Sequence, residues 1–124
     1  MSAPLQLSIP KFVLQTLNHL YDAERKLTLH GDPGGALRNI ERIKDAFAEE
    51  KLFYEDPMGQ PFNETRADLD ASIAGEGTEN LHVTEVIKPV IRYGEPAYSR
   101  VIQKGIVVVR SKTVEAGNQA GELQ

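Results

Sequence analysis

The feature that most constrains the fold is a pair of amphipathic segments separated by a short glycine-rich break. Between Pro10 and about Leu29, apolar residues recur at spacings of three, four and seven, which places them on one face of an α-helix. The sequence His-Gly-Asp-Pro-Gly-Gly at residues 30–35 predicts the end of that helix and a turn. A second amphipathic helix is predicted from about Ala36 to Glu50. Because the connection is short, we expect the two helices to pack antiparallel.

The second half of the chain has the composition of β-strands. Short strands are predicted at residues 52–54 and 69–73, and β-branched residues dominate two longer segments at 81–93 and 100–109. Pro89 removes one donor from its ladder, so that strand should lie at an edge or carry a bulge. Helices first and antiparallel strands second is the order typical of the α+β class.

This reading divides the chain into a flexible lead (1–9), a helical region (10–50), a β-rich region (51–111) and a disordered tail (112–124). Two paired helices bury only part of their wide apolar stripes. The remainder should cover a sheet or meet the same helices of a second copy, and both alternatives remain open at this point. The main stripe residues are Val13, Leu17, Leu20, Leu27, Ile40, Ile43 and Phe47.

Composition argues against several classes of protein. The chain has no cysteine, which excludes disulfides, thiolate zinc sites and cysteine nucleophiles. The net charge of −4 and the lack of any run of three basic residues argue against nucleic acid as a partner. No apolar stretch approaches the roughly 20 residues that cross a bilayer, and the first ten residues do not resemble a secretion signal. We therefore expect a cytoplasmic protein with no membrane partner.

The residues that could carry chemistry do not form a recognisable site. His19 and His30 are eleven residues apart on the first predicted helix, about 16 Å at the helical rise, which is too far for one metal. His82 has no ligand partner at a suitable spacing, and the carboxylates of residues 49–56 are expected to be solvated. We expect no metal, no cofactor and no catalysis. A small enzyme would be favoured only if His82, His30 and a carboxylate converged on one pocket.

Several short motifs, in their order and spacing, resemble a known family. They are Gly59-Gln60-Pro61-Phe62-Asn63, then Val83 with Glu85-Val86, then Arg100-Val101-Ile102 and Val107-Val108-Val109. These are similar to the Gly-Glu-Pro-Phe-Asp-Pro stretch, the Val-rich strand and the Gly-Arg-Val-Ile-Arg-Pro-Ala segment with a closing Val-x-Val of the GrpE family, the nucleotide exchange factors of the bacterial DnaK chaperone. The helical region adds Leu14, Leu17, Asp22 and Ala23, and Ile40-Glu41. The resemblance spans about residues 12–110.

The resemblance implies a homodimer that binds the nucleotide-binding domain of a DnaK-type chaperone. In that family the short helices of two chains form a four-helix bundle, and a small β-domain projects from each chain like a wing. One wing holds the nucleotide cleft open, so that ADP leaves. The stripe residues named above then become dimerisation residues. The implied partner face comprises Pro61, Phe62, Gly94, Arg100 and Val109, although core packing is an equal alternative for Phe62 and Val109.

The chain also departs from the family pattern. The long N-terminal coiled-coil helix is expected to be missing, the Lys-Gly-Tyr after the Val-rich strand is Pro89-Val90-Ile91, and the Arg-Pro-Ala segment is Gln103-Lys104-Gly105. The hairpin near residues 94–99 is longer. These departures leave open an alternative function, a structural or assembly subunit that retains a GrpE-like fold without exchange activity.

Overall fold

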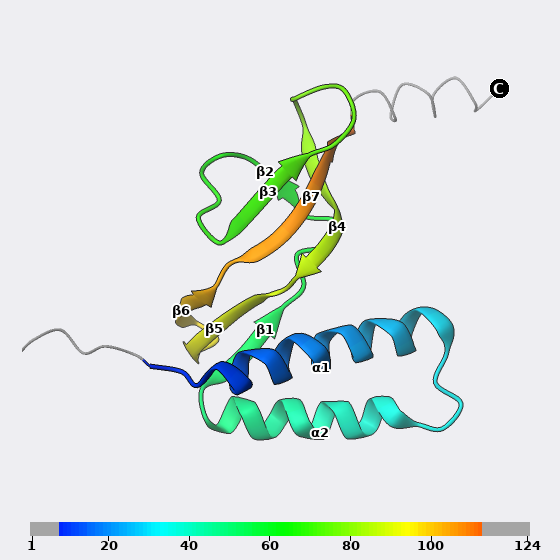
Figure 1. The fold of residues 1–124 in the computed structure, drawn as a ribbon, viewed down its shortest axis with the longest axis vertical. Coiled ribbons are helices and arrows are strands. Elements are labelled where there is room, and N and C mark those ends of the chain that lie inside the picture. The colour runs from blue at the N-terminus through cyan, green and yellow to red at the C-terminus, as the bar shows by residue number, and fades with distance from the viewer. Residues whose placement is uncertain (1–7, 113–124) are drawn as a thin grey trace, which may run out of the picture.

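The chain folds as two helices followed by seven strands, in a computed structural model that describes residues 8–112 (Figure 1). Helix α1 spans Lys11–His30 and helix α2 spans Ala36–Glu49. The two helices lie side by side, and the chain reverses direction between them (Figure 1). The predicted α+β class is confirmed.

The turn between the helices is fixed by glycine geometry and by an aspartate. The backbone N–H of Gly31 donates to the carbonyl of Leu27 at 2.9 Å, and its φ of 102° lies in the region that favours glycine. The carboxylate of Asp32 accepts the backbone N–H groups of Ala36 and Leu37 at 2.7 and 2.9 Å. Those donors have no partner within the helix, so Asp32 caps α2.

The strands form two sheets. Their bounds are β1 Leu52–Glu55, β2 Pro61–Phe62, β3 Leu69–Ile73, β4 Leu81–Lys88, β5 Val90–Glu95, β6 Tyr98–Gln103 and β7 Gly105–Ser111. A three-stranded sheet has the order β1-β5-β6, and a four-stranded sheet has the order β2-β4-β7-β3. We call the four-stranded sheet with residues 56–88 and 105–112 the lobe, and residues 8–55 with 90–103 the base. The lobe extends away from the helices (Figure 1).

The prediction of a purely antiparallel β region is wrong for one pair, because β3 runs parallel to β7. Strands β3 and β4 follow each other along the chain, and β7 lies between them in the sheet. The chain reverses direction between β3 and β4, so β7, which is antiparallel to β4, runs parallel to β3 on its other side.

Each of the two long predicted strands is in fact two strands that belong to different sheets. Pro89 separates β4 from β5, and Lys104 separates β6 from β7. Pro89 has no N–H to continue a ladder, which ends β4 at that point. Bulges also interrupt the β4–β7 pairing, between Val83 and Glu85 and between Val86 and Lys88.

Two buried clusters form the core, and α1 contributes to both. Leu17 packs in the base with Leu52 and Ile91, and half-buried side chains, Phe47 among them, surround this cluster. Tyr21, one turn later, packs in the lobe. The other buried residues of this lobe cluster are Leu69, Leu81, Val83, Val86, Val107 and Val109, joined by Val90 from the base.

The predicted flexible lead and disordered tail fall mostly on residues 1–7 and 113–124, outside the described residues. Ile9 packs against the base cluster, and the N–H of Lys112 donates to the carbonyl of Asn80 at 3.0 Å. Within residues 8–112, neither helix is long and apolar enough to span a membrane.

Candidate functional site

The structure places three of the five predicted partner-face residues in the lobe. Val109 is 0% exposed in the lobe core, because alternate residues of β7 point inward, so of its two predicted alternatives core packing holds and partner contact does not. Phe62 is half-buried against the same core, and Pro61 is exposed beside it in β2.

The other two residues lie in the base, on the hairpin of β5 and β6. Gly94 faces Ser99 across the hairpin, and Arg100 is exposed on β6, the edge strand. A Cβ atom on Gly94 would lie 3.0 Å from both the Ser99 Cα and the Tyr98 carbonyl oxygen, and its φ of 133° also favours glycine. The turn itself is Pro96-Ala97, so Gly94 belongs to the strand and not to the tip.

A polar network connects the two parts of this predicted face. The Arg66 guanidinium holds the Asp68 carboxylate with bonds of 2.9 and 3.0 Å and donates to the carbonyl of Pro61 at 2.9 Å. Arg92 of β5 lies 3.8 Å from the same carboxylate and contacts the Ser99 hydroxyl at 3.5 Å. Asp68 is therefore shared by an arginine of the lobe and an arginine of the base.

The electrostatics of this network favour its charged form. The hydrogen bond from Arg66 holds the pKa of Asp68 below its usual range, and the same bond raises the pKa of Arg66. Arg92 is further held by Glu55, whose carboxylate accepts from Nε at 2.7 Å. Sequence reasoning missed Arg66, Asp68 and Arg92. The only signal that the sequence offers is that Arg66 and Asp68 carry opposite charges two residues apart. It does not indicate that Arg92, 24 residues after Asp68, joins them.

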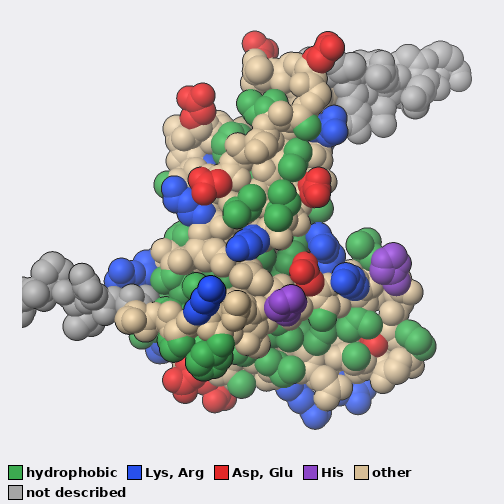
Figure 2. All heavy atoms as spheres, viewed as in Figure 1, with side chains coloured by type: hydrophobic (Ala, Val, Ile, Leu, Met, Phe, Trp, Pro, Cys, Tyr) green, Lys and Arg blue, Asp and Glu red, His purple; other side chains and the backbone are tan. Residues whose placement is uncertain are grey.

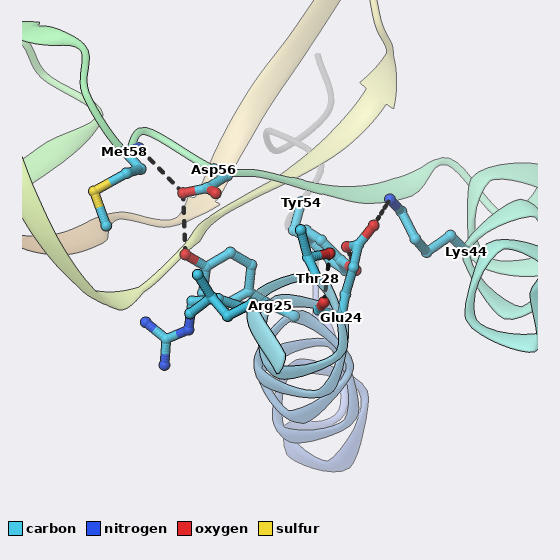
Figure 3. Close-up of a pocket in the computed structure, with 9 residues that line it drawn as sticks. Glu24, Arg25, Thr28, Lys44, Tyr54, Asp56 and Met58 are labelled. Carbon is cyan, nitrogen blue, oxygen red and sulfur yellow. Dashed lines mark hydrogen bonds and ion pairs between the residues drawn. The ribbon is translucent and has the colours of Figure 1, made fainter. Parts of the chain in front are cut away.

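A second feature is an open cleft of about 430 Å³ where the helices meet the segment after β1 (Figure 3). Figure 3 shows Asp56 beside Met58, and Glu24 reaching toward Lys44. The residues that line the cleft are Tyr21, Glu24, Arg25, Thr28, Leu29, Lys44, Tyr54, Asp56 and Met58.

The polar groups of the cleft bond to one another. The Tyr21 hydroxyl donates to Asp56 at 3.0 Å, the Tyr54 hydroxyl donates to Glu24 at 2.5 Å, and Lys44 donates to Glu24 at 3.0 Å. The two tyrosine rings meet edge to face with centroids 5.7 Å apart. Burial, and next the hydrogen bonds to these carboxylates, raise the pKa of both tyrosines. Both phenols thus stay protonated near neutral pH and act as hydrogen-bond donors.

Among the described residues, the cleft lacks the grouping of side chains that a metal ion requires. Across residues 8–112, no three His, Cys, Asp or Glu side chains are grouped so that they could hold a metal ion. None of the three histidines lines the cleft: His19 and His30 are exposed on α1, and His82 lies beside the Asn80 carbonyl. His82, His30 and a carboxylate, whose convergence would favour a small enzyme, therefore do not meet at this cleft.

The predicted dimerisation residues fall into two groups. Leu17 is 1% exposed against the three-stranded sheet and Ile40 is also buried within one chain, so their assignment to a dimer face is corrected. Val13 and Phe47 are half-buried against the base cluster. The more accessible residues of the set are Leu20 and Leu27, which are half-buried, and Ile43, which is 42% exposed.

Hydrophobic side chains remain uncovered on the helices. Figure 2 shows them gathered over α1 and α2 on the face turned to the viewer. Phe12, which is 66% exposed, is the largest apolar side chain that α1 leaves in solvent at its N-terminal end. A single chain therefore leaves an apolar surface on its helices.

Comparisons with known proteins return nothing: no family model, no curated protein and no solved structure matches the chain. What the chain does has to be inferred from its own residues.

Proposed function

We propose that the chain is a cytoplasmic, GrpE-like co-chaperone that binds the nucleotide-binding domain of a DnaK-type chaperone and promotes ADP release. It does so without catalysing a reaction itself. One observation carries the proposal: the helices keep exposed apolar side chains, while four of the strands build a lobe whose buried core takes only Tyr21 from the helices. The family resemblance of residues 12–110 gives these two parts their roles.

The helices supply the dimer in this proposal. Phe12 and Ile43 are exposed apolar side chains on the two helices, and apolar surface that a chain leaves exposed marks interaction sites. The same face of a second copy offers a matching apolar surface, and two helix pairs packed in this way form a four-helix bundle. The lobes then project from the bundle as the two wings.

The partner face uses Pro61, Phe62, Gly94 and Arg100, now without Val109. Pro61 and Arg100 are exposed, and the network through Asp68 connects their surroundings. A wedge that opens a cleft acts by binding one conformer of its partner better than another, which requires a stiff contact surface and no chemistry. The paired arginines around Asp68 support such stiffness.

The test is release of fluorescent ADP from the DnaK-type chaperones of the same organism. The wild-type chain is expected to accelerate release. Arg100→Ala should lose most of that acceleration, because arginines at the centre of interfaces are frequent hot spots worth about 2 kcal/mol or more. Arg38→Ala, which removes an exposed arginine of α2, serves as the matched control and should behave as wild type.

Two results would count against this function. If the chain neither binds nor accelerates any of these chaperones, the proposal fails. Binding without faster ADP release would favour the alternative of an assembly subunit that keeps the fold and lacks exchange activity.

The dimer is tested separately by light scattering at micromolar concentration. The expected mass is twice the 13.7 kDa of one chain, and Ile43→Asp should shift it toward the monomer. Gln15→Asp, an equivalent charge at an exposed position of α1, should leave the mass unchanged. A wild-type chain that stays monomeric and folded would rule out the bundle.

A further inference from the structure

We infer that Asn18, Tyr21 and Arg25 of α1 act as a three-point clamp that fixes the angle of the lobe relative to the base. The three residues follow spacings of three and four, which place them on one face of the helix. Each of them contacts a different part of the chain near the boundary between base and lobe. This inference goes beyond the proposed function and does not depend on the identity of the partner.

Few backbone connections join the two parts at their boundary. Within residues 8–112, the chain crosses between base and lobe at three points: after Glu55, at Pro89 and at Lys104. At the last two points a strand ends and the next begins in the other sheet, so no ladder continues through the corner. Pro89 has no N–H, and it offers the corner only its carbonyl oxygen.

Asn18 holds this corner through Gln103. The two side-chain amides bond reciprocally, with Asn18 Nδ2 donating to Gln103 Oε1 at 3.0 Å and Gln103 Nε2 donating to Asn18 Oδ1 at 2.8 Å. Gln103 Nε2 also donates to the Pro89 carbonyl at 3.0 Å. The side-chain amide of Gln103, the last residue of β6, therefore links α1 to the break between β4 and β5.

Tyr21 and Arg25 hold the lobe itself. Tyr21 is the only residue of α1 in the buried lobe cluster, and its hydroxyl donates to Asp56 at 3.0 Å. Arg25 donates to the carbonyl of Val86 at 3.2 Å, next to the second bulge of β4. Leu17 is meanwhile fixed in the base core, so one helix is anchored on both sides of the boundary.

The three contacts are spread along the axis of α1. Asn18 and Arg25 are seven residues apart, about 10 Å along the helix axis, and Tyr21 lies between them. Contacts spread over that length resist rotation of the lobe about the corner, together with the Arg92–Asp68 contact that also crosses the boundary. Loss of the Asn18–Gln103 pair should therefore loosen the angle while both cores stay folded.

The absence of cysteine makes a direct measurement possible. Arg38→Cys in α2 and Ser72→Cys in β3 introduce two exposed positions for spin labels, one in the base and one in the lobe. Pulsed electron–electron double resonance then gives the distribution of distances between the labels. Dilution of the labelled chain with unlabelled chain keeps the measurement within one chain even in a dimer.

In this background, Asn18→Ala and Gln103→Ala are each expected to broaden the distance distribution. The double variant should be no broader than Gln103→Ala, because both changes remove the same contact to α1. Gln15→Ala removes an exposed amide from α1 away from the corner and should leave the distribution as in the parent.

The clamp is overturned if Asn18→Ala folds normally and keeps the distribution of the parent, whatever Gln103→Ala does. Asn18→Ala is the decisive variant because it leaves the bond from Gln103 to the Pro89 carbonyl in place. Circular dichroism of each variant establishes that the fold is retained. Since only this chain is present, the result is independent of chaperone binding.

Discussion

Gly105 provides the sharpest test of the packing where β6 passes into β7. Gly105 is buried, and a Cβ atom added to it would lie 2.9 Å from Leu69 Cδ2 and 3.0 Å from Val90 Cγ2. Both neighbours belong to the lobe core, so neither can swing into solvent. The φ of Gly105 is outside the left-handed region, so Gly105→Ala adds a steric conflict without backbone strain.

The magnitude follows from two opposing effects. Overpacking of a well-filled core costs about 1–3 kcal/mol. Replacing glycine by alanine stiffens the unfolded chain, which returns about 0.4–1 kcal/mol. We therefore expect Gly105→Ala to lower the free energy of unfolding by about 1–2 kcal/mol. With a urea m-value of about 2 kcal/mol/M, the midpoint should fall by roughly 0.5–1 M.

Urea unfolding followed by circular dichroism measures this shift, at one fixed protein concentration because association would move the midpoint. Gly34→Ala is the matched control: nothing lies within 4 Å of its added Cβ atom, and its φ is also outside the left-handed region. That variant should be as stable as the parent or slightly more stable. A Gly105→Ala chain that unfolds at the parent midpoint with the parent m-value would refute the close packing at the corner.

Three further predictions concern single contacts. Tyr21→Phe removes the hydroxyl bonded to Asp56 and should lower the free energy of unfolding by about 1 kcal/mol in the same urea titration. Gly94→Ala should cost about 1–3 kcal/mol, because its φ is left-handed and its Cβ atom would meet backbone atoms of the facing strand. Arg66 lowers the folded-state pKa of Asp68, so the contribution of this carboxylate is present above its unfolded pKa of about 3.9 and is lost as the pH falls through the folded value. Unfolding followed from pH 6 downward should therefore show a shallower acid loss in Asp68→Asn than in the parent.

The helices could be predicted from sequence because their signals are local. The predicted first helix, 10–29, differs by one residue at each end from the observed Lys11–His30, and the second ends one residue early at Glu49. Both rest on periodicity and on the glycines of the break. Strand β3 was predicted with its observed bounds for a similar reason, since turn residues flank it on both sides.

The arrangement of the strands could not be predicted because it depends on the whole sheet. Composition indicates a strand at 81–93 but does not say that the chain leaves one sheet at Pro89 and enters another. Lys104 does not indicate a break between two strands either, although the chain changes sheets there as well. The network of Arg66, Asp68 and Arg92 was missed for the same reason, because its members meet only once both sheets are formed.

The wrong assignment of Leu17 to a dimer face has a different origin. The sequence shows that the apolar stripe of α1 is wide, but it does not show which part of the stripe packs within the chain. At about 100° per residue, Tyr21 lies about 40° to one side of Leu17 and Leu20 about 60° to the other. The side with Tyr21 is buried against the strands, whereas Leu20 stays half-exposed together with Leu27. One apolar arc is thus divided: its centre and one edge hold the chain together, and the other edge stays half-exposed. Periodicity measures the width of such an arc, but only the position of the strands decides where the division falls.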